Sequence, residues 1–228
     1  MLMRADALLS RYGYCSRRQS ALWVKRGALT CDGRPVGSPA DKVDPVRVLV
    51  DGKPIEFPEG LFIKLHKPVG FVCSHSEDEG PSVYDLLPPQ WMRRTPVPTV
   101  AGRLDKDATG LVLITDDHQL VHRLISPRHK VPKEYRVELD RPVDENVGIQ
   151  FASGTLMLNA EDAPCLPASL TQEPGSSCRV TLFEGRYHQV KRMFAACGYE
   201  VRALHRLCIG AWNLGALEVG TWESATGE

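Results

Sequence analysis

The sequence lacks three features that would assign it to a special class of protein. No apolar run approaches the ~20 residues of a transmembrane helix, the first residues carry no signal-peptide pattern, and the seven cysteines include no C-x-x-C pair. These absences predict free thiols in the reducing cytoplasm and no contact with a membrane. The composition, 43% hydrophobic and 25% charged, is that of an ordinary globular protein.

Net charge is also absent, since 28 Lys and Arg residues balance 28 Asp and Glu residues. The charges are unevenly distributed along the chain, however. Residues 1–34 carry seven basic side chains against two acidic ones, whereas residues 138–162 carry six acidic against one basic. Such asymmetry indicates one face for a polyanion and another that faces water.

Residues 1–58 are predicted to form a small module of their own. Residues 5–12 form one expected helix, and Ser16 with Gln19 makes a capping box for a second helix. Short strands joined by Asp-Gly turns are expected over residues 28–31 and 46–50. Prolines and a glycine near residue 58 mark a linker, so we expect a second domain over residues 59–228.

Four basic residues lie in the expected second helix, Arg17 and Arg18 in its first turn and Lys25 and Arg26 at its end. A solvated helix face is the ordinary explanation for any single charge. A cluster of positive charges on a small helical pair is nevertheless what binding to a phosphate backbone requires. These residues are therefore candidate RNA contacts.

The centre of the second domain is the stretch from residue 101 to residue 117. A polar loop carrying Arg103, Asp105 and Asp107 runs into the apolar residues 111–114, which read as a buried strand. A charged loop fixed to a buried strand holds a reactive group rigidly. Asp105 is the preferred catalytic carboxylate, and the alternative is that it is a solvated turn residue.

Periodicity predicts the elements on both sides of this loop. We expect a strand over residues 61–65 with a return over residues 71–73, and a half-buried strand that starts at Tyr135. Val190, Met193, Phe194 and Cys197 form one apolar stripe of a helix.

The segments that flank the catalytic strand carry further charged residues. The proline-rich loop over residues 88–98 holds Arg93 and Arg94, which could reach RNA. After the strand, Asp116 and Asp117 can cap a helix that carries two histidines, His118 and His122. We reject zinc there, because a Gln follows the first histidine and no third ligand stands out.

Several blocks of the sequence resemble the RsuA/RluB/RluE/RluF-type pseudouridine synthases, and the N-terminal module resembles an S4-type RNA-binding domain. The blocks occur in family order and together span about residues 61–210. They are Lys67–Ser74, Gly102–Asp105 with Thr109–Leu111 and Thr115–Asp117, Ser126–His129, Lys133–Tyr135 and Glu184–Phe194.

The resemblance assigns roles to individual residues. It implies that Asp105 is catalytic, that Lys191 is its ion partner, that Tyr135 packs against the target base and that Val190 supports the base pocket. Five further arginines are expected to contact the substrate or its phosphates because of their positive charge. They are Arg103, Arg186, Arg192, Arg202 and Arg206.

The resemblance also implies a fold and an activity. The expected fold is α+β, with an S4-like module before a catalytic domain built on a mixed, mostly antiparallel sheet. The expected activity is isomerisation of a uridine in ribosomal RNA, with base flipping, no metal or organic cofactor, and a monomeric protein. The sequence motif over residues 186–194 resembles the enzymes that modify 16S RNA more than those that modify 23S RNA, so it favours 16S RNA as the substrate.

Three questions stay open at the level of sequence. A non-catalytic S4-type RNA-binding or ribosome-assembly protein is an alternative to an enzyme, although Asp105, Tyr135 and Lys191 are all present. Hydrolysis of a sugar would need a second acid, for which Asp107 is the nearest candidate. Nucleophilic attack by the carboxylate and formation of a glycal are equally compatible with the residues.

Overall fold

The computed structural model describes residues 1–225, and the chain divides into two compact units. The first unit consists of Met1–Phe62, Tyr84–Thr99 and Ile114–His118, and the second of Ile63–Val83, Val100–Leu113 and the chain from Gln119 onward. No helix in the described part is long and apolar enough to cross a membrane. A domain boundary between residues 58 and 59 remains a prediction.

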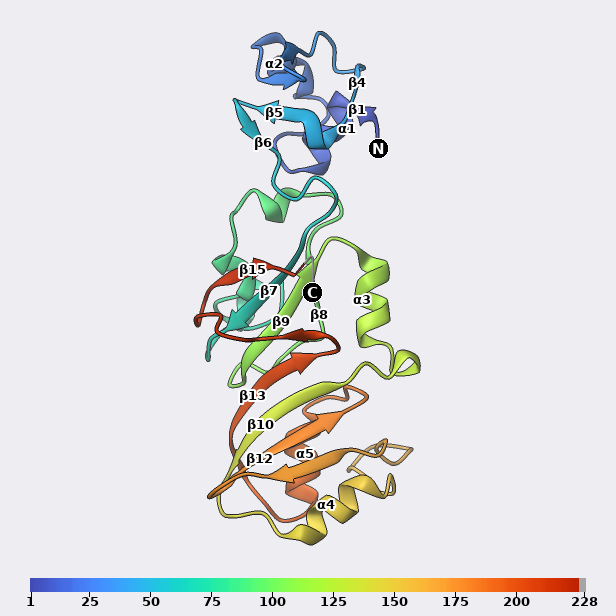
Figure 1. Ribbon diagram of the computed structural model, residues 1–228, viewed down its shortest axis with the longest axis vertical. Coiled ribbons are helices and arrows are strands. Elements are labelled where there is room, and N and C mark those ends of the chain that lie inside the picture. The colour runs from blue at the N-terminus through green and yellow to red at the C-terminus, as the bar shows by residue number, and fades with distance from the viewer. Residues whose placement is uncertain (226–228) are drawn as a thin grey trace. The chain divides into compact units, whose positions relative to one another are not determined.

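The first unit packs two short helices against short strands (Figure 1). Its helices are α1 (Ala5–Arg11) and α2 (Ser20–Lys25). Strands β1 (Met3–Arg4) and β4 (Lys42–Val43) form a pair, and a four-stranded sheet has the order β3 (Arg34–Pro35), β2 (Leu29–Cys31), β5 (Val48–Val50), β6 (Lys53–Pro54). Its core includes Leu8, Leu9, Leu29 and Val48, which are fully buried.

Two tight turns set the register of the four-stranded sheet. Both residues of the turns Asp32-Gly33 and Asp51-Gly52 have positive φ, at 51° and 75° and at 48° and 77°. This is the backbone that two-residue hairpins with right-handed twist require. The predicted hairpins are therefore confirmed.

The second helix begins later than predicted. The Gln19 side chain accepts hydrogen bonds from the backbone N–H of Ser16 at 3.1 Å and from its hydroxyl at 2.9 Å. The bond to the Ser16 backbone N–H is that of the predicted capping box. The next three residues nevertheless form a turn with i→i+3 backbone bonds, from Gln19 to Ser16 at 3.0 Å and from Ser20 to Arg17 at 3.3 Å, so α2 starts at Ser20. Arg17 and Arg18 consequently precede the helix rather than forming its first turn.

Arg94 does not reach RNA, which corrects the sequence-based expectation. Its side chain is 2% exposed and lies 2.9 Å from the Asp116 carboxylate, and it donates to the carbonyls of Glu56 and Phe57 at 3.1 Å each. Asp116 also accepts from the backbone N–H of Leu61 at 2.9 Å, so it does not cap the following helix as expected. The pair joins separate segments of the first unit, and Arg93 remains exposed.

The second unit is built on a nine-stranded sheet with the main order β11-β12-β10-β13-β9-β7-β15. Strand β10 pairs antiparallel with β12 and β13, whereas β13 pairs parallel with β9, so the sheet is mixed as predicted. Strands β14 and β8 join at β13 and β9. The strands are β7 (Phe62–Lys67), β8 (Thr99–Ala101), β9 (Thr109–Thr115), β10 (Lys133–Leu139), β11 (Ser169–Gln172), β12 (Ser177–Leu182), β13 (Val201–Ile209), β14 (Trp212–Asn213) and β15 (Trp222–Ser224).

Helices α3, α4 and α5 accompany this sheet (Figure 1). Helices α4 (Glu145–Ala152) and α5 (Gln189–Ala196) lie near β10 and β12, and α3 (His118–Ile125) lies beside β8 and β9. Phe151 of α4 and Phe194 of α5 meet edge to face, with ring centroids 5.1 Å apart. Short 3₁₀ turns supply the remaining helical residues, over Pro45–Arg47, Glu77–Glu79, Val83–Leu86, Trp91–Arg93 and Pro127–His129.

Most elements that periodicity predicted are present. The core of β9 is fully buried, β10 alternates between buried and more exposed residues, and α5 buries Val190, Met193 and Phe194. The expected return strand over residues 71–73 is wrong, because only an isolated bridge joins Val72 to Ser82 there. No disulfide links the seven cysteines, all of which lie in the described residues.

Candidate active site

The candidate catalytic loop connects β8 to β9 and ends where β9 meets β13. Gly110 pairs with Arg206 in the parallel ladder and has a φ of +108°. A Cβ atom at Gly110 would lie 2.3 Å from the Arg206 carbonyl oxygen. Only glycine allows this approach, which fixes the end of the loop against β13.

Arg206 fastens the loop from inside the protein. Arg206 is 1% exposed, and its guanidinium donates to the carbonyls of Gly102 at 2.7 Å, Leu111 at 2.8 Å and Arg103 at 3.3 Å. The expectation that Arg206 forms a basic rim for phosphates is therefore wrong, because its hydrogen-bonding groups face backbone carbonyls. Its contribution is to hold the two ends of the loop together.

Lys67 braces the same loop from the end of β7. The side chain is fully buried, and its Nζ donates to the carbonyls of Ala108 at 2.6 Å, Pro68 at 3.0 Å and Lys106 at 3.2 Å. Burial lowers the pKa of Lys67. Sequence reasoning missed this role, although a lysine at an inward position of an apolar strand was a visible signal.

The loop presents Asp105 beside Lys191 of α5. The Lys191 Nζ lies 3.3 Å from Asp105 Oδ2 and 2.6 Å from Asp107 Oδ1. The Asp105 and Lys191 side chains are 22% and 25% exposed, whereas Asp107 is 70% exposed. The structure thus brings together the carboxylate and the cation that the resemblance paired, with Asp107 as the nearer partner of the lysine.

The ionisation of this cluster follows from its contacts. Burial opposes the charge of Lys191, but the hydrogen bond to Asp107 and the charge of Asp105 outweigh burial and raise the lysine pKa. The hydrogen bond from Lys191 in turn lowers the pKa of Asp107. The charged Lys191 lies within ion-pair distance of Asp105, and a carboxylate held in this way can act as a nucleophile or a base.

His188 is a residue of the site that sequence reasoning missed. Its Nε2 lies 3.3 Å from Asp105 Oδ1, and its ring stacks on Tyr187 with centroids 3.8 Å apart and an angle of 18°. His188 is the N-cap of α5 and has left-handed backbone angles, φ 48° and ψ 36°. No pattern in the sequence signals that backbone state for a histidine.

Two predicted substrate contacts are buried near the loop. Tyr135 of β10 is 7% exposed, and the Arg206 guanidinium lies 6.0 Å from its ring centroid. Val190, in the first turn of α5, is 4% exposed. Arg103, by contrast, directs an exposed side chain outward while its carbonyl accepts from Arg206.

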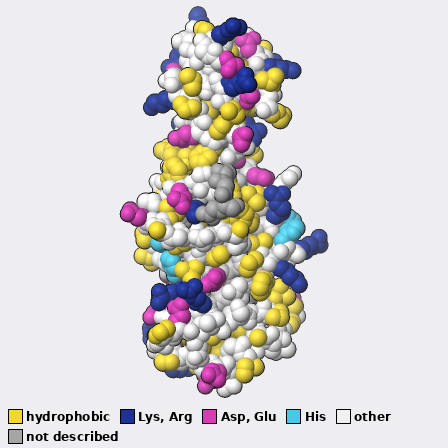
Figure 2. All heavy atoms as spheres, in the orientation of Figure 1, with side chains coloured by type: hydrophobic (Ala, Val, Ile, Leu, Met, Phe, Trp, Pro, Cys, Tyr) yellow, Lys and Arg dark blue, Asp and Glu magenta, His cyan; other side chains and the backbone are white. Residues whose placement is uncertain are grey.

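The predicted RNA contacts fall into two groups in the structure. In the first unit Arg17, Arg18 and Lys25 are exposed, while Arg26 lies 2.7 Å from Asp51 and 4.2 Å from the Trp23 ring centroid. Figure 2 shows that basic side chains are spread over the viewed surface of the molecule, among acidic ones.

The second group, Arg186 and Arg192, makes internal bonds. Arg186 donates to the carbonyls of Ala163 at 2.7 Å and Pro164 at 2.6 Å, and Arg192 lies 2.7 Å from the Glu161 carboxylate. Both arginines therefore tie the segment around residues 159–164 to the turn before α5. Contact with RNA remains a prediction for them.

No three His, Cys, Asp or Glu side chains within residues 1–225 are grouped as metal ligands. The groups that the site does offer are two carboxylates, one lysine, one histidine and the buried tyrosine.

Comparison with known proteins identifies the class. Residues 62–196 match the family described as RNA pseudouridylate synthase, and residues 3–45 match the S4 domain. The chain belongs to the RNA pseudouridine synthase family and carries an S4 domain ahead of its synthase domain. It is an isomerase that acts on RNA, and the predicted family, fold class and enzyme class are confirmed.

Individual relatives match almost the whole chain. The "Ribosomal small subunit pseudouridine synthase A" of Escherichia coli K12 is 40% identical over 99% of this chain and 97% of its own length. The "Uncharacterized RNA pseudouridine synthase YtzG" of Bacillus subtilis is 38% identical over 99% of this chain and 96% of its own. A solved pseudouridylate synthase structure is 37% identical, has a TM-score of 0.66, and covers 97% of this chain and 95% of its own.

Proposed function

We propose that this protein converts one uridine of 16S ribosomal RNA to pseudouridine, with Asp105 as the catalytic carboxylate. The observation that carries the proposal is the 3.3 Å contact between Asp105 and Lys191 on a loop that Lys67 and Arg206 hold from inside. The small-subunit activity named for relatives at 40% identity supports 16S RNA as the substrate.

The reaction needs few groups. The bond from ribose C1′ to uracil N1 breaks, the base turns, and C1′ joins C5; the C5 proton leaves and N1 gains one, so the product is an isomer. No oxidant, reductant or cofactor enters this balance. Asp105 either attacks C1′ or removes the 2′ proton, and the ion pair with Lys191 at 3.3 Å positions the carboxylate for either step.

The other residues bind and position the RNA in this proposal. The target uridine flips out of its stack to reach Asp105. Tyr135 packs against the detached base, Val190 supports its pocket, and Arg103 contacts the RNA beside it. The exposed Arg17, Arg18 and Lys25 bind phosphates. Arg26 contributes less to phosphate binding, because its guanidinium already pairs with Asp51.

The molecular context of the reaction is part of the proposal. We assign residues 1–58 to the RNA-binding domain and residues 59–228 to the catalytic domain. The protein acts as a monomer in the cytoplasm, where ribosomes assemble. Sedimentation of the protein with and without RNA tests the oligomeric state.

The test of the proposed function is pseudouridine mapping in cells that lack the gene. Carbodiimide modification and primer extension on 16S and 23S RNA should show one missing 16S stop, which wild-type protein restores. Asp105→Asn should reduce the rate at least about 10³-fold without unfolding the protein. Asp107→Asn is the matched control and should retain most of the activity.

Each other outcome has a defined meaning. If the restored primer-extension stop lies in 23S RNA, the substrate is 23S and not 16S RNA. Full activity in Asp105→Asn would remove Asp105 from the mechanism. If neither RNA lacks a stop, the protein would be a non-catalytic RNA-binding protein.

A further inference from the structure

We propose that Tyr187 and His188 form a stacking platform for an unpaired base of the RNA, the one next to the target uridine along the strand. The ligand class is therefore a single-stranded nucleobase. This inference rests on the proposed function, since it extends the same site to a second nucleotide.

The first observation is the exposure of Tyr187. Its residue surface is 71% exposed, the largest fraction for any aromatic residue in the described part of the chain. One face of its ring is covered by the His188 ring, 3.8 Å away and inclined by 18°. With 71% of the residue exposed, most of the remaining Tyr187 surface faces solvent, so a flat ring can continue the stack. Unpaired RNA bases are held on aromatic side chains in this way, whatever their sequence.

The second observation is the position of the stack relative to the reacting group. The His188 Nε2 lies 3.3 Å from the Asp105 carboxylate. A base on the Tyr187 face opposite His188 is then separated from His188 by one ring. The uridine that is flipped toward Asp105 and the base on Tyr187 are thus placed as neighbours on one strand, and the platform compensates for the stacking that flipping breaks.

The third observation is that the platform is held in a single arrangement. Gln189 is 4% exposed; it accepts from the Arg186 backbone N–H at 2.9 Å and donates to Glu184 at 2.7 Å. Arg192 donates to the Tyr187 carbonyl at 3.1 Å. These bonds fix the turn whose left-handed residue is His188. A preformed surface binds without first being ordered.

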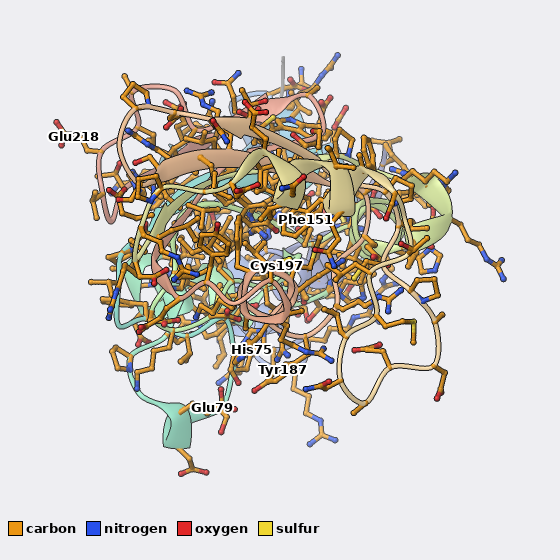
Figure 3. All side chains as sticks on the ribbon, turned by 90° about the horizontal axis from the view of Figure 1, so that it is seen from below. His75, Glu79, Phe151, Tyr187, Cys197 and Glu218 are labelled. Carbon is orange, nitrogen blue, oxygen red and sulfur yellow. The ribbon has the colours of Figure 1, made fainter. Side chains whose placement is uncertain are left out.

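The surroundings favour nucleic acid. Lys191 lies beside Asp105 as a charged neighbour, and the Arg103 side chain is exposed on the catalytic loop. Figure 3 labels Tyr187 at the lower margin of the molecule, on the side of the loop that carries His75 and Glu79. That loop is tied to the catalytic loop, because the Lys106 ammonium donates to the Glu79 carbonyl at 3.0 Å. An RNA strand reaching Asp105 meets Tyr187 next to these groups.

The test uses fluorescence rather than activity alone. An RNA fragment that contains the mapped uridine carries 2-aminopurine on its 5′ side in one preparation and on its 3′ side in another. Full-length Asp105→Asn protein binds this RNA without converting it. In one of the two preparations, stacking on Tyr187 should quench the 2-aminopurine, and Tyr187→Phe should quench it equally. Tyr187→Ala should abolish the quenching and weaken binding about 10-fold.

Controls separate the platform from other roles. Phe183→Ala removes another exposed aromatic side chain, just after β12, and should leave both quenching and affinity unchanged. In otherwise wild-type protein, Tyr187→Ala should raise KM and change kcat less than about threefold. A lower kcat with unchanged KM would mean that Tyr187 only supports the His188 ring.

The two proposals fail in different ways. Equal quenching with and without the Tyr187→Ala substitution, or no quenching in either RNA preparation, would overturn the platform. Absence of pseudouridine after incubation of the same fragment with wild-type protein would overturn the proposed substrate, and the quenching comparison would still report on the platform.

Discussion

Lys67 is a buried cation whose three hydrogen bonds all end on backbone carbonyls. Replacing it with methionine keeps the aliphatic length but removes the Lys67 donor from the carbonyls of Pro68 and Ala108, whereas the Lys106 carbonyl still accepts from the Gly70 backbone N–H at 2.8 Å. An unsatisfied buried polar group costs about 1–3 kcal/mol. We expect Lys67→Met to lower the free energy of unfolding in urea by about 3 kcal/mol, the sum for these two groups.

Lys106→Met is the matched control for this change. Lys106 is exposed, and its side-chain ammonium donates a hydrogen bond to the Glu79 carbonyl. Surface substitutions of this kind stay within about 0.5 kcal/mol. Equal losses in the two variants would show that the buried bonds of Lys67 do not hold the loop.

The stability that depends on Lys67 should vary with pH. Burial lowers the pKa of Lys67 in the folded protein, while the unfolded value is about 10.4. Between these two values the unfolded chain binds more protons, so stability rises with pH. The advantage of wild type over Lys67→Met should therefore grow as pH rises through the folded pKa toward about 10.4. Urea unfolding of both proteins across alkaline pH measures it, and a constant difference would contradict the assignment.

The residues of the site differ in how far the sequence shows them. Asp105 and Lys191 could be selected because their side chains carry the chemistry and occur in recognisable blocks. The role of Arg206 could not, since a cation that bonds to backbone carbonyls has no partner side chain in the sequence. For Lys67 the sequence did carry a signal, its inward position in an apolar strand, but no partner. His188 was also missed, because its contact with Asp105 depends on a left-handed backbone state.

At the scale of elements, β9 and β13 pair in parallel at Gly110 and Arg206, where their backbones approach closely. Gly110→Ala would place a methyl group 2.3 Å from the Arg206 carbonyl oxygen and would strain a φ of +108°. Backbone atoms cannot move aside as a flexible side chain can. We expect this substitution to cost more than about 3 kcal/mol, measured by urea unfolding.

Gly185→Ala is the control for the loss of glycine itself. Gly185 has an ordinary φ and no neighbouring heavy atom within 4 Å of an added Cβ. The change should be neutral or stabilise the protein by up to about 1 kcal/mol, because alanine restricts the unfolded chain. Similar stabilities for the Gly110 and Gly185 variants would contradict a close approach of the Gly110 and Arg206 backbones.

The periodicity of hydrophobic residues correctly predicted the strands and the helix that follow it. Strands β9 and β10 and helix α5 follow their patterns because packing and periodicity agree there. The errors in the helices fall at their starts, where polar side chains have more than one possible hydrogen-bond partner. Asp116 pairs with buried Arg94 instead of capping α3, and α2 starts at Ser20 although the predicted bond between Ser16 and Gln19 is present. Such competition between partners is decided by tertiary contacts that the sequence does not show.

At the scale of the whole molecule, zero net charge means that RNA affinity must come from local groups. Each phosphate contact contributes about 0.7 to the slope of log affinity against log salt concentration for a single strand. Replacing Arg17, Arg18 and Lys25 together with glutamine should therefore reduce that slope by about 2. Filter binding of the 16S fragment between about 50 and 200 mM salt, the range over which such contacts are resolved, measures it.

Arg179→Gln supplies the comparison for this last prediction. Arg179 is as basic and is half exposed, but its guanidinium already lies 2.6 Å from Glu173 and 3.0 Å from Glu134. Its loss should leave the slope unchanged, because a paired arginine releases no counterion from RNA. If the triple variant keeps the wild-type slope while its S4 domain stays folded, the phosphates are bound by the second unit, and Arg103 becomes the first residue to replace.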